Sequence, residues 1–255
     1  MGCKEYDQVL TKLIRPQTHP LAIKILGPDD EPAANLDRPD NYGIQVAVCQ
    51  WVTMARRWGR PMSVLAGDVN CSPCLASLGL KRMRTASALA DYFMEMGYFA
   101  AKELALKAAE KLDPIPHGKI KGLAIYPLSM AESEPDLVVI YGNPAQMARL
   151  ASAFVHFSGE FVQSATTGFG ISCLSMLKPH FSGKPAIVVP GRGERILAGA
   201  EEGEMYCSFP FGLMEQLLDS LEQTQNSGSR YPFQRYVLFQ PPLTPAFANL
   251  NQALE

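Results

Sequence analysis

Short, uninterrupted apolar runs occur at five places along the chain, at 21–26, 122–128, 137–141, 186–189 and 236–239. Runs of this length that are rich in Val, Ile, Leu and Tyr are typical of buried strands. Between them, apolar residues recur at spacings of three and four, which predicts amphipathic helices. These helical stripes are Ile44, Val48, Trp51, Ala55 and Trp58; Leu89, Phe93 and Met96; and Met147, Leu150, Phe154 and Phe157.

Strands that alternate with amphipathic helices indicate an α/β fold, and we expect a mixed sheet flanked by helices. The 255 residues are 47% hydrophobic and contain no long linker, so a single domain covering residues 1–255 is the simplest organisation. This composition excludes a disordered or low-complexity chain.

A weak internal repeat is visible, because the segment 20–28 resembles the segment 136–144. Each is later followed by a helical stretch and then by a glycine and a cysteine, and the matching residues are Gln50, Ala55, Arg56, Gly67 and Cys71 in one half and Gln146, Ala148, Arg149, Gly170 and Cys173 in the other. The repeat predicts two similar halves related by pseudo-symmetry, with Cys71 and Cys173 in equivalent strand-to-helix turns. Chance similarity between two generic strand-helix units is the alternative interpretation.

The net charge of −2 and the pI of about 6.1 give no overall positive field, so we do not expect the chain to bind nucleic acid. No apolar run is long enough for a transmembrane helix, and residues 1–6 lead into an amphipathic helix, so we expect no membrane partner and a cytoplasmic location. In that reducing compartment, six cysteines point to metal binding or redox chemistry and not to disulfides.

The strongest chemical signal is Cys71-Ser72-Pro73-Cys74, because two thiols at this spacing reach one metal, one cluster iron or each other. Pro73 favours a helix start, which would place Cys71 and Cys74 where thiolates are stabilised. With Cys49 and Cys173, these two form the predicted metal-ligand set. Cys207 fits a strand, and either Cys207 or Cys3 is a possible replacement for Cys49.

Four thiolates suit an iron–sulfur cluster, which tolerates ligands that are far apart in sequence. Zinc is the alternative metal, although structural zinc sites usually pair two Cys-x-x-Cys elements and this chain has only one. A dithiol redox pair, a thiolate nucleophile at Cys71 or Cys173, and plain burial of cysteines as small apolar residues remain open as well.

A second candidate site is the loop that follows the apolar run 186–189. Its glycines Gly191 and Gly193 would expose backbone amides, and Arg192 and Arg195 would offer guanidinium groups to a carboxylate or phosphate. The loop lacks the spacing of either nucleotide-binding glycine motif. An ordinary surface turn is the alternative.

Taken in order along the chain, several short motifs resemble the domain of unknown function 169 family, the uncharacterised ArCR group of archaea and anaerobic bacteria. They are Pro20 to Lys24, Cys49-Gln50, Ala55-Arg56, Cys71 and Cys74 before Leu78-Gly79-Leu80, Tyr126-Pro127-Leu128, 135–139, Cys173, Gly193-Glu194-Arg195 and Phe209-Pro210. The resemblance covers about residues 6–221 and implies no assigned reaction. The anaerobic distribution it implies favours an oxygen-sensitive cluster.

We therefore expect a cytoplasmic iron–sulfur protein with a redox or small-ligand role in anaerobic metabolism. A non-redox protein that binds a small anionic molecule, or a zinc-binding or thiolate enzyme, is the alternative. Its partner would be a small molecule or a redox protein, and a homodimer is the commonest assembly for such a chain.

Overall fold

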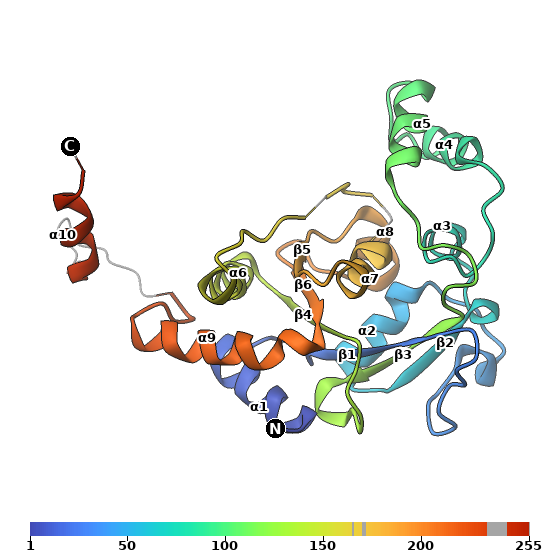
Figure 1. The fold of residues 1–255 in the computed structure, drawn as a ribbon. Coiled ribbons are helices and arrows are strands. Elements are labelled where there is room, and N and C mark those ends of the chain that lie inside the picture. Colours follow the sequence, from blue (N-terminus) through green and yellow to red (C-terminus); the bar gives the residue numbers. More distant parts are fainter. Residues whose placement is uncertain (165, 170–171, 234–243, 255) are drawn as a thin grey trace.

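The computed structural model describes residues 1–164, 166–169, 172–233 and 244–254. In this part of the chain, the strands form one open sheet in the order β2-β3-β1-β4-β6-β5, with helices on both faces (Figure 1). The strands are β1 (Leu21–Leu26), β2 (Met62–Leu65), β3 (Gly122–Pro127), β4 (Leu137–Gly142), β5 (Ala186–Val188) and β6 (Met205–Pro210). The predicted α/β fold with a helix-flanked sheet is confirmed.

Four of the five apolar runs form β1, β3, β4 and β5, and the fifth, at 236–239, lies outside the described residues. The strand position expected for Cys207 is confirmed by β6. The apolar-run analysis missed β2, which is only four residues long and carries a buried serine, Ser63.

Every pairing between the six strands is antiparallel, so the expectation of a mixed sheet is wrong. The parallel contacts in the described residues are two isolated bridges, Asp37 to Met62 and Val46 to Val69. The physical reason lies in the strand order. A helical connection does leave β2 pointing the same way as β1, but β3 lies between them and pairs antiparallel with both. The same happens in the other half, where β6 lies between β4 and β5.

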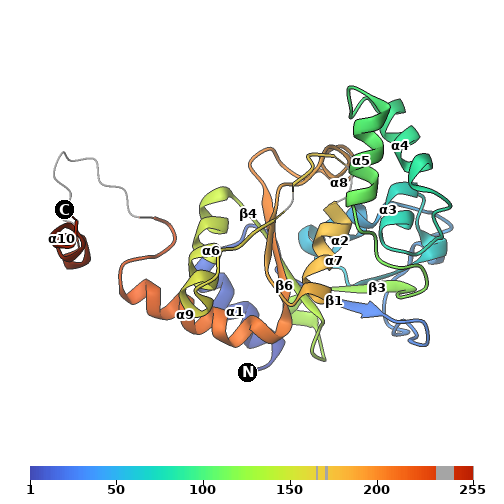
Figure 2. The same cartoon turned by 45° about the horizontal axis from the view of Figure 1, so that its top comes forward.

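The two faces of the sheet carry different helices, because successive side chains along a strand point to opposite faces. Leu21 and Ile23 of β1 contribute to the core under α2 (Val48–Trp58), α3 (Ser72–Ser77) and α7 (Ser172–Ser182), whereas Ala22 faces the opposite layer. That layer consists of α1 (Cys3–Ile14), α6 (Pro144–Ser158) and α9 (Met214–Asn226), and Figure 2 shows the sheet between the two groups.

The strand order reads the same from either edge of the sheet, as β2-β3-β1 and as β5-β6-β4. The predicted pseudo-symmetry is nevertheless not confirmed in the form the sequence suggests, because α2 and α6, which the repeat equates, cover opposite faces. Gly170, the glycine that the repeat matches to Gly67, lies outside the described residues. By position it is α7 that corresponds to α2, since both precede an edge strand and cover the same face.

A helical hairpin of α4 (Ala86–Glu95) and α5 (Lys102–Lys111) stands beside α3 and has its own small core of Ala90, Phe93, Ala105 and Ala109. The ring of Phe169 connects this core to the body of the protein and stacks on Tyr98 with a centroid separation of 4.8 Å. The remaining helices are α8 (Arg192–Ala198) and α10 (Pro245–Gln252). Within the described residues, no helix is both long and apolar enough to cross a membrane.

Candidate cysteine-lined site

A cavity of about 240 Å³ lies between α2, α3, α4, α7 and α8, and four of the six cysteines line it. These are Cys49, Cys71, Cys74 and Cys173, the four predicted metal ligands. All six cysteines of the chain are free thiols. Residues separated by more than 120 positions in sequence therefore contribute thiols to one cavity, and the whole fold is needed to assemble it.

Cys71 and Cys74 belong to the start of α3. Cys71 is the N-cap residue, Ser72 is the first helical residue, and Pro73 lies in the first turn, as expected. The far end of α3 is fixed by Gly79, whose positive φ and closeness to the carbonyl of Ile115 leave no room for a Cβ atom. Of these two thiols, Cys74 is buried and Cys71 is half-buried, so Cys71 is the one accessible from solvent.

The pKa values of the two thiols of α3 are shifted in opposite directions. A hydrogen bond from the Cys74 side chain outweighs the effect of burial and lowers the pKa of Cys71 to about 6. Hydrogen bonding with Cys173 and Cys71, together with burial, raises the pKa of Cys74. At neutral pH, Cys71 is therefore a thiolate that accepts a hydrogen bond from the Cys74 thiol.

Cys49 and Cys173 occupy matching positions, because each is the second residue of its helix, α2 or α7. The Cys173 sulfur lies 4.0 Å from the hydroxyl oxygen of Ser77 in α3. Burial raises the pKa of Cys49, and the charges of Cys173, Glu194 and Cys71 add to that effect. Cys49 lines the same cavity as the other three thiols.

Cys3 and Cys207 lie in the opposite layer, with α1, α6 and α9, and the sheet separates them from the cavity. The suggestion that either could replace Cys49 is therefore wrong. Strand alternation explains the position of Cys207, since its neighbour Tyr206 points to the cavity side and Cys207 to the other.

The predicted anion loop reaches the same cavity. Arg192 and Gly193 of α8 line it, and Gly191 is the N-cap residue of that helix. The predicted loop is therefore the first turn of a helix. Arg195 points away from the cavity, because its guanidinium donates to the carbonyl oxygens of Pro190, Glu201 and Glu204 and so holds the start of α8 in place. The two candidate sites of the sequence are thus one site, to which Arg192 contributes a side chain and Arg195 only structural support.

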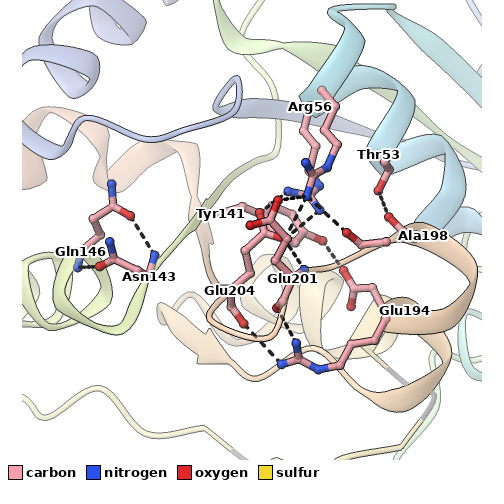
Figure 3. Close-up of polar contacts among 12 residues, drawn as sticks. Thr53, Arg56, Tyr141, Asn143, Gln146, Glu194, Ala198, Glu201 and Glu204 are labelled. Atoms are coloured by element: carbon pink, nitrogen blue, oxygen red, sulfur yellow. Dashed lines mark hydrogen bonds and ion pairs between the residues drawn. The ribbon is translucent and has the colours of Figure 1, made fainter.

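Glu194, the third residue of α8, joins this cavity to a buried polar network (Figure 3). The hydroxyl of Tyr141 in β4 donates to Glu194 Oε1 at 2.5 Å. The guanidinium of Arg56 in α2 lies over the Tyr141 ring, 4.1 Å from its centroid, and binds both carboxylate oxygens of Glu204 at 2.7 and 3.0 Å. Hydrogen bonds from Arg56 and from the amide of Glu201 lower the pKa of Glu204, although burial alone would raise it.

The sequence interpretation missed this network, apart from noting Arg56 in the repeat. One signal was available, since Arg56 follows Val52 and Ala55 on the apolar face of α2, and a buried arginine requires a partner. The sequence could not identify the partner of Arg56, because Glu204 is 148 positions away in the chain.

Within the described residues, no group of three or more His, Cys, Asp or Glu side chains is arranged to hold a metal ion. The four thiols thus share a cavity without forming a closed single-ion site. A metal centre there would require the thiols to shift towards it.

The family model for domain of unknown function 169, the uncharacterised ArCR family, matches residues 9–220, and the chain belongs to that family. The resemblance expected from the sequence motifs is confirmed over nearly the same range. No curated protein and no solved structure matches the chain significantly.

Proposed function

We propose that this member of the uncharacterised ArCR family holds an iron–sulfur cluster in the cysteine-lined cavity and uses it for electron transfer or to bind a small ligand. The observation that carries the proposal is the convergence of Cys49, Cys71, Cys74 and Cys173 on one cavity. Four cysteine thiolates are the usual ligand set of such clusters, and their wide sequence separation is tolerated.

The chemistry of the donor set fits a cationic iron centre. Cys71 is ionised at neutral pH, and iron would displace the protons of the other three thiols. Burial raises the pKa of Cys49, and hydrogen bonds with Cys173 and Cys71 together with burial raise the pKa of Cys74. A bound metal would supply the positive charge that favours the thiolate form of both. A cluster spreads its thiolates over several iron atoms, so it needs less convergence of the sulfur atoms than a single zinc ion does.

The surroundings suit a redox or ligand-binding centre. Half-buried Cys71 gives access from solvent, and the hairpin residues Tyr92, Met96 and Tyr98 shield the cavity on one side. When bound, a cluster would supply one-electron transfer or an iron coordination position. Free thiols and an oxygen-sensitive centre both suit the reducing cytoplasm of an anaerobe.

The test is anaerobic purification followed by iron, sulfide and zinc analysis and a visible absorption spectrum. We expect iron and sulfide in similar amounts and a brown protein, and Cys71→Ser and Cys173→Ser to lose most of the iron. Cys3→Ser, on the other face of the sheet, is the matched control and should keep it. Zinc without sulfide would replace the cluster by the alternative metal, and a colourless, metal-free protein under anoxia would refute both.

A second candidate function, a dithiol redox pair, is favoured by the opposite pKa shifts of Cys71 and Cys74. The Cys71 thiolate would attack a disulfide in a partner and release one partner thiolate. Cys74 would then lose its proton and attack the mixed disulfide, leaving a Cys71–Cys74 disulfide and the reduced partner.

The pH dependence of alkylation tests the thiolate on which this candidate depends. In metal-free protein, Cys71 should react with iodoacetamide at a rate that is half-maximal near its pKa of about 6 and changes little above pH 7. Cys207, whose pKa burial raises, should react only after unfolding. A free thiol has a pKa of about 8–9. If the rate at Cys71 were half-maximal only at about pH 8.5, Cys71 would not be a thiolate at neutral pH, and this candidate would lose its support.

A further inference from the structure

The cavity has an inner part and a rim that differ in chemistry. Cys74 and Glu194 are almost fully buried and form the inner part. At the rim, Ile196 is 66% exposed, Leu197 49% and Met96 38%, and the exposed side chain of Arg192 lies among them. A molecule entering from solvent therefore meets apolar surface and one guanidinium before it meets the thiols.

Arg192 is the one cationic side chain that lines the cavity in the described part of the chain. The neighbouring guanidinium groups are already engaged, Arg56 and Arg57 by Glu204 and Arg195 by carbonyl oxygens. No hydrogen bond or ion pair of the Arg192 side chain occurs within the described residues. Arg192 thus keeps its guanidinium available for a carboxylate, for which it is the best-matched side chain.

Tyr92 of α4 lines the same cavity as this guanidinium. Burial raises the pKa of Tyr92 to about 12, and Tyr98 and Cys71 add to that effect, whereas the charge of Arg192 opposes it. Tyr92 is therefore a neutral phenol within the fields of both Arg192 and Cys71. Its hydroxyl and the Arg192 guanidinium are two donors that a single carboxylate could accept from.

The side chains that line the cavity suit a singly charged ligand. Within the described residues Arg192 is the one guanidinium in the lining, and the carboxyl group of Glu194 follows it in the same turn of α8, so one carboxylate is better matched to this site than a phosphate dianion. The volume of about 240 Å³ lies below the roughly 300–1,000 Å³ of drug-sized sites, so the ligand is small. The apolar rim formed by Met96, Ile196 and Leu197 favours an apolar body.

We propose that the cavity binds a small monocarboxylate with an apolar body, with the carboxylate on Arg192 and Tyr92 and the body against Met96 and Leu197. This inference deepens the proposed function and rests on it, because the body of the ligand would lie beside the proposed metal centre. It names the class of small ligand that the centre would receive.

Benzoate is the probe. Benzyl alcohol lacks the negative charge, acetate lacks the apolar ring, and inorganic phosphate carries a higher charge, so these three are the matched controls. With the anaerobically purified full chain, benzoate should bind saturably in calorimetry and raise the unfolding temperature. Benzyl alcohol, acetate and phosphate should each bind at least about 10-fold more weakly, the factor that a loss of about 1.4 kcal/mol produces. Equal binding of benzyl alcohol, or tighter binding of phosphate, would overturn the inference.

The variant Arg192→Ala should weaken benzoate at least about 10-fold, as expected for loss of a charge-assisted pair, and Arg192→Lys should recover part of the affinity. Arg60→Ala, which removes a surface arginine bound to Asp37 outside the cavity, should leave binding unchanged. An Arg192→Ala variant with full benzoate affinity would refute the assignment. Metal content is measured in the same samples, so metal-loaded protein that ignores benzoate contradicts only this inference, and metal-free protein that binds benzoate through Arg192 contradicts only the metal centre.

Discussion

The two walls of the cavity come from matching places in the two halves of the sheet, and they differ in how they are held. On one wall, α3 follows the edge strand β2, and on the other, α8 follows the edge strand β5. The third residue of each helix is buried and lines the cavity, Cys74 in α3 and Glu194 in α8.

We call the α8 side, with Glu194, the charged wall, and the α3 side, with Cys71 and Cys74, the thiol wall. The charged wall is held by hydrogen bonds between oxygen atoms. Glu194 accepts from Tyr141, and Thr53 of α2 donates to the carbonyl of Ala198 at the end of α8. The far end of the thiol wall is tied by the amide of Ile115, which donates to the carbonyl of Ser77 at 2.9 Å. Its cavity-facing side chains, in contrast, make sulfur contacts, such as the 4.0 Å approach of Ser77 to Cys173, and sulfur is a weak hydrogen-bonding partner. The comparison teaches that the cavity has a rigid side and an adaptable side, and the adaptable side is the one that would rearrange around a metal.

The largest effect should come from Arg56→Met, which removes the cation that ties α2 to the charged wall. Glu204 would remain buried without its bidentate partner, and loss of one member of a buried ion pair costs about 3–5 kcal/mol. Chemical denaturation would measure the free energy of unfolding. Replacing Glu204 in the same protein, as Arg56→Met with Glu204→Leu, should recover part of the loss. A single variant as stable as the unmodified protein would show that the charged wall is not held by this pair.

A smaller effect is expected for Tyr141→Phe. The phenyl ring keeps its place under Arg56, so only the hydroxyl donor to Glu194 is lost, and removing one partner of a buried hydrogen bond costs about 1–3 kcal/mol. Tyr126→Phe is the control, because within the described residues its hydroxyl makes no hydrogen bond. Equal stability losses in the two variants would mean that the Tyr141 hydroxyl contributes nothing specific to the charged wall.

The sequence predicted the thiol wall better than the charged one, for a physical reason. A strand run and a Cys-x-x-Cys pair are local patterns, so β1, β4, Cys71 and Cys74 could be identified from their neighbours in the chain. The spacing of Cys71 and Cys74 also limits what these two thiols can hold, and the internal repeat adds Cys173 to them.

The charged wall depends on contacts that no local pattern encodes. Tyr141 and Glu194 are 53 positions apart, and they meet because β6 pairs with β4 and β5 and brings α8 over the sheet. The same nonlocal pairing made the sheet antiparallel where alternating strands and helices favoured a mixed one. Pairing partners are decided by packing of the whole chain, so they had to be read from the structure.

The smallest effect, and the sharpest check of the comparison, is expected for Ser77→Ala on the thiol wall. The Ser77 hydroxyl donates to the carbonyl of Cys74, but the amide of Leu78 already donates to that oxygen at 3.0 Å, so no acceptor is left unsatisfied. Only the weak contact with Cys173 is lost, and alanine favours the helix by up to about 0.5 kcal/mol, so the net change in unfolding free energy should stay below about 1 kcal/mol. A loss in Ser77→Ala as large as that in Tyr141→Phe would show that the thiol wall is as firmly held as the charged one, and the adaptable side of the cavity would then have to be sought elsewhere.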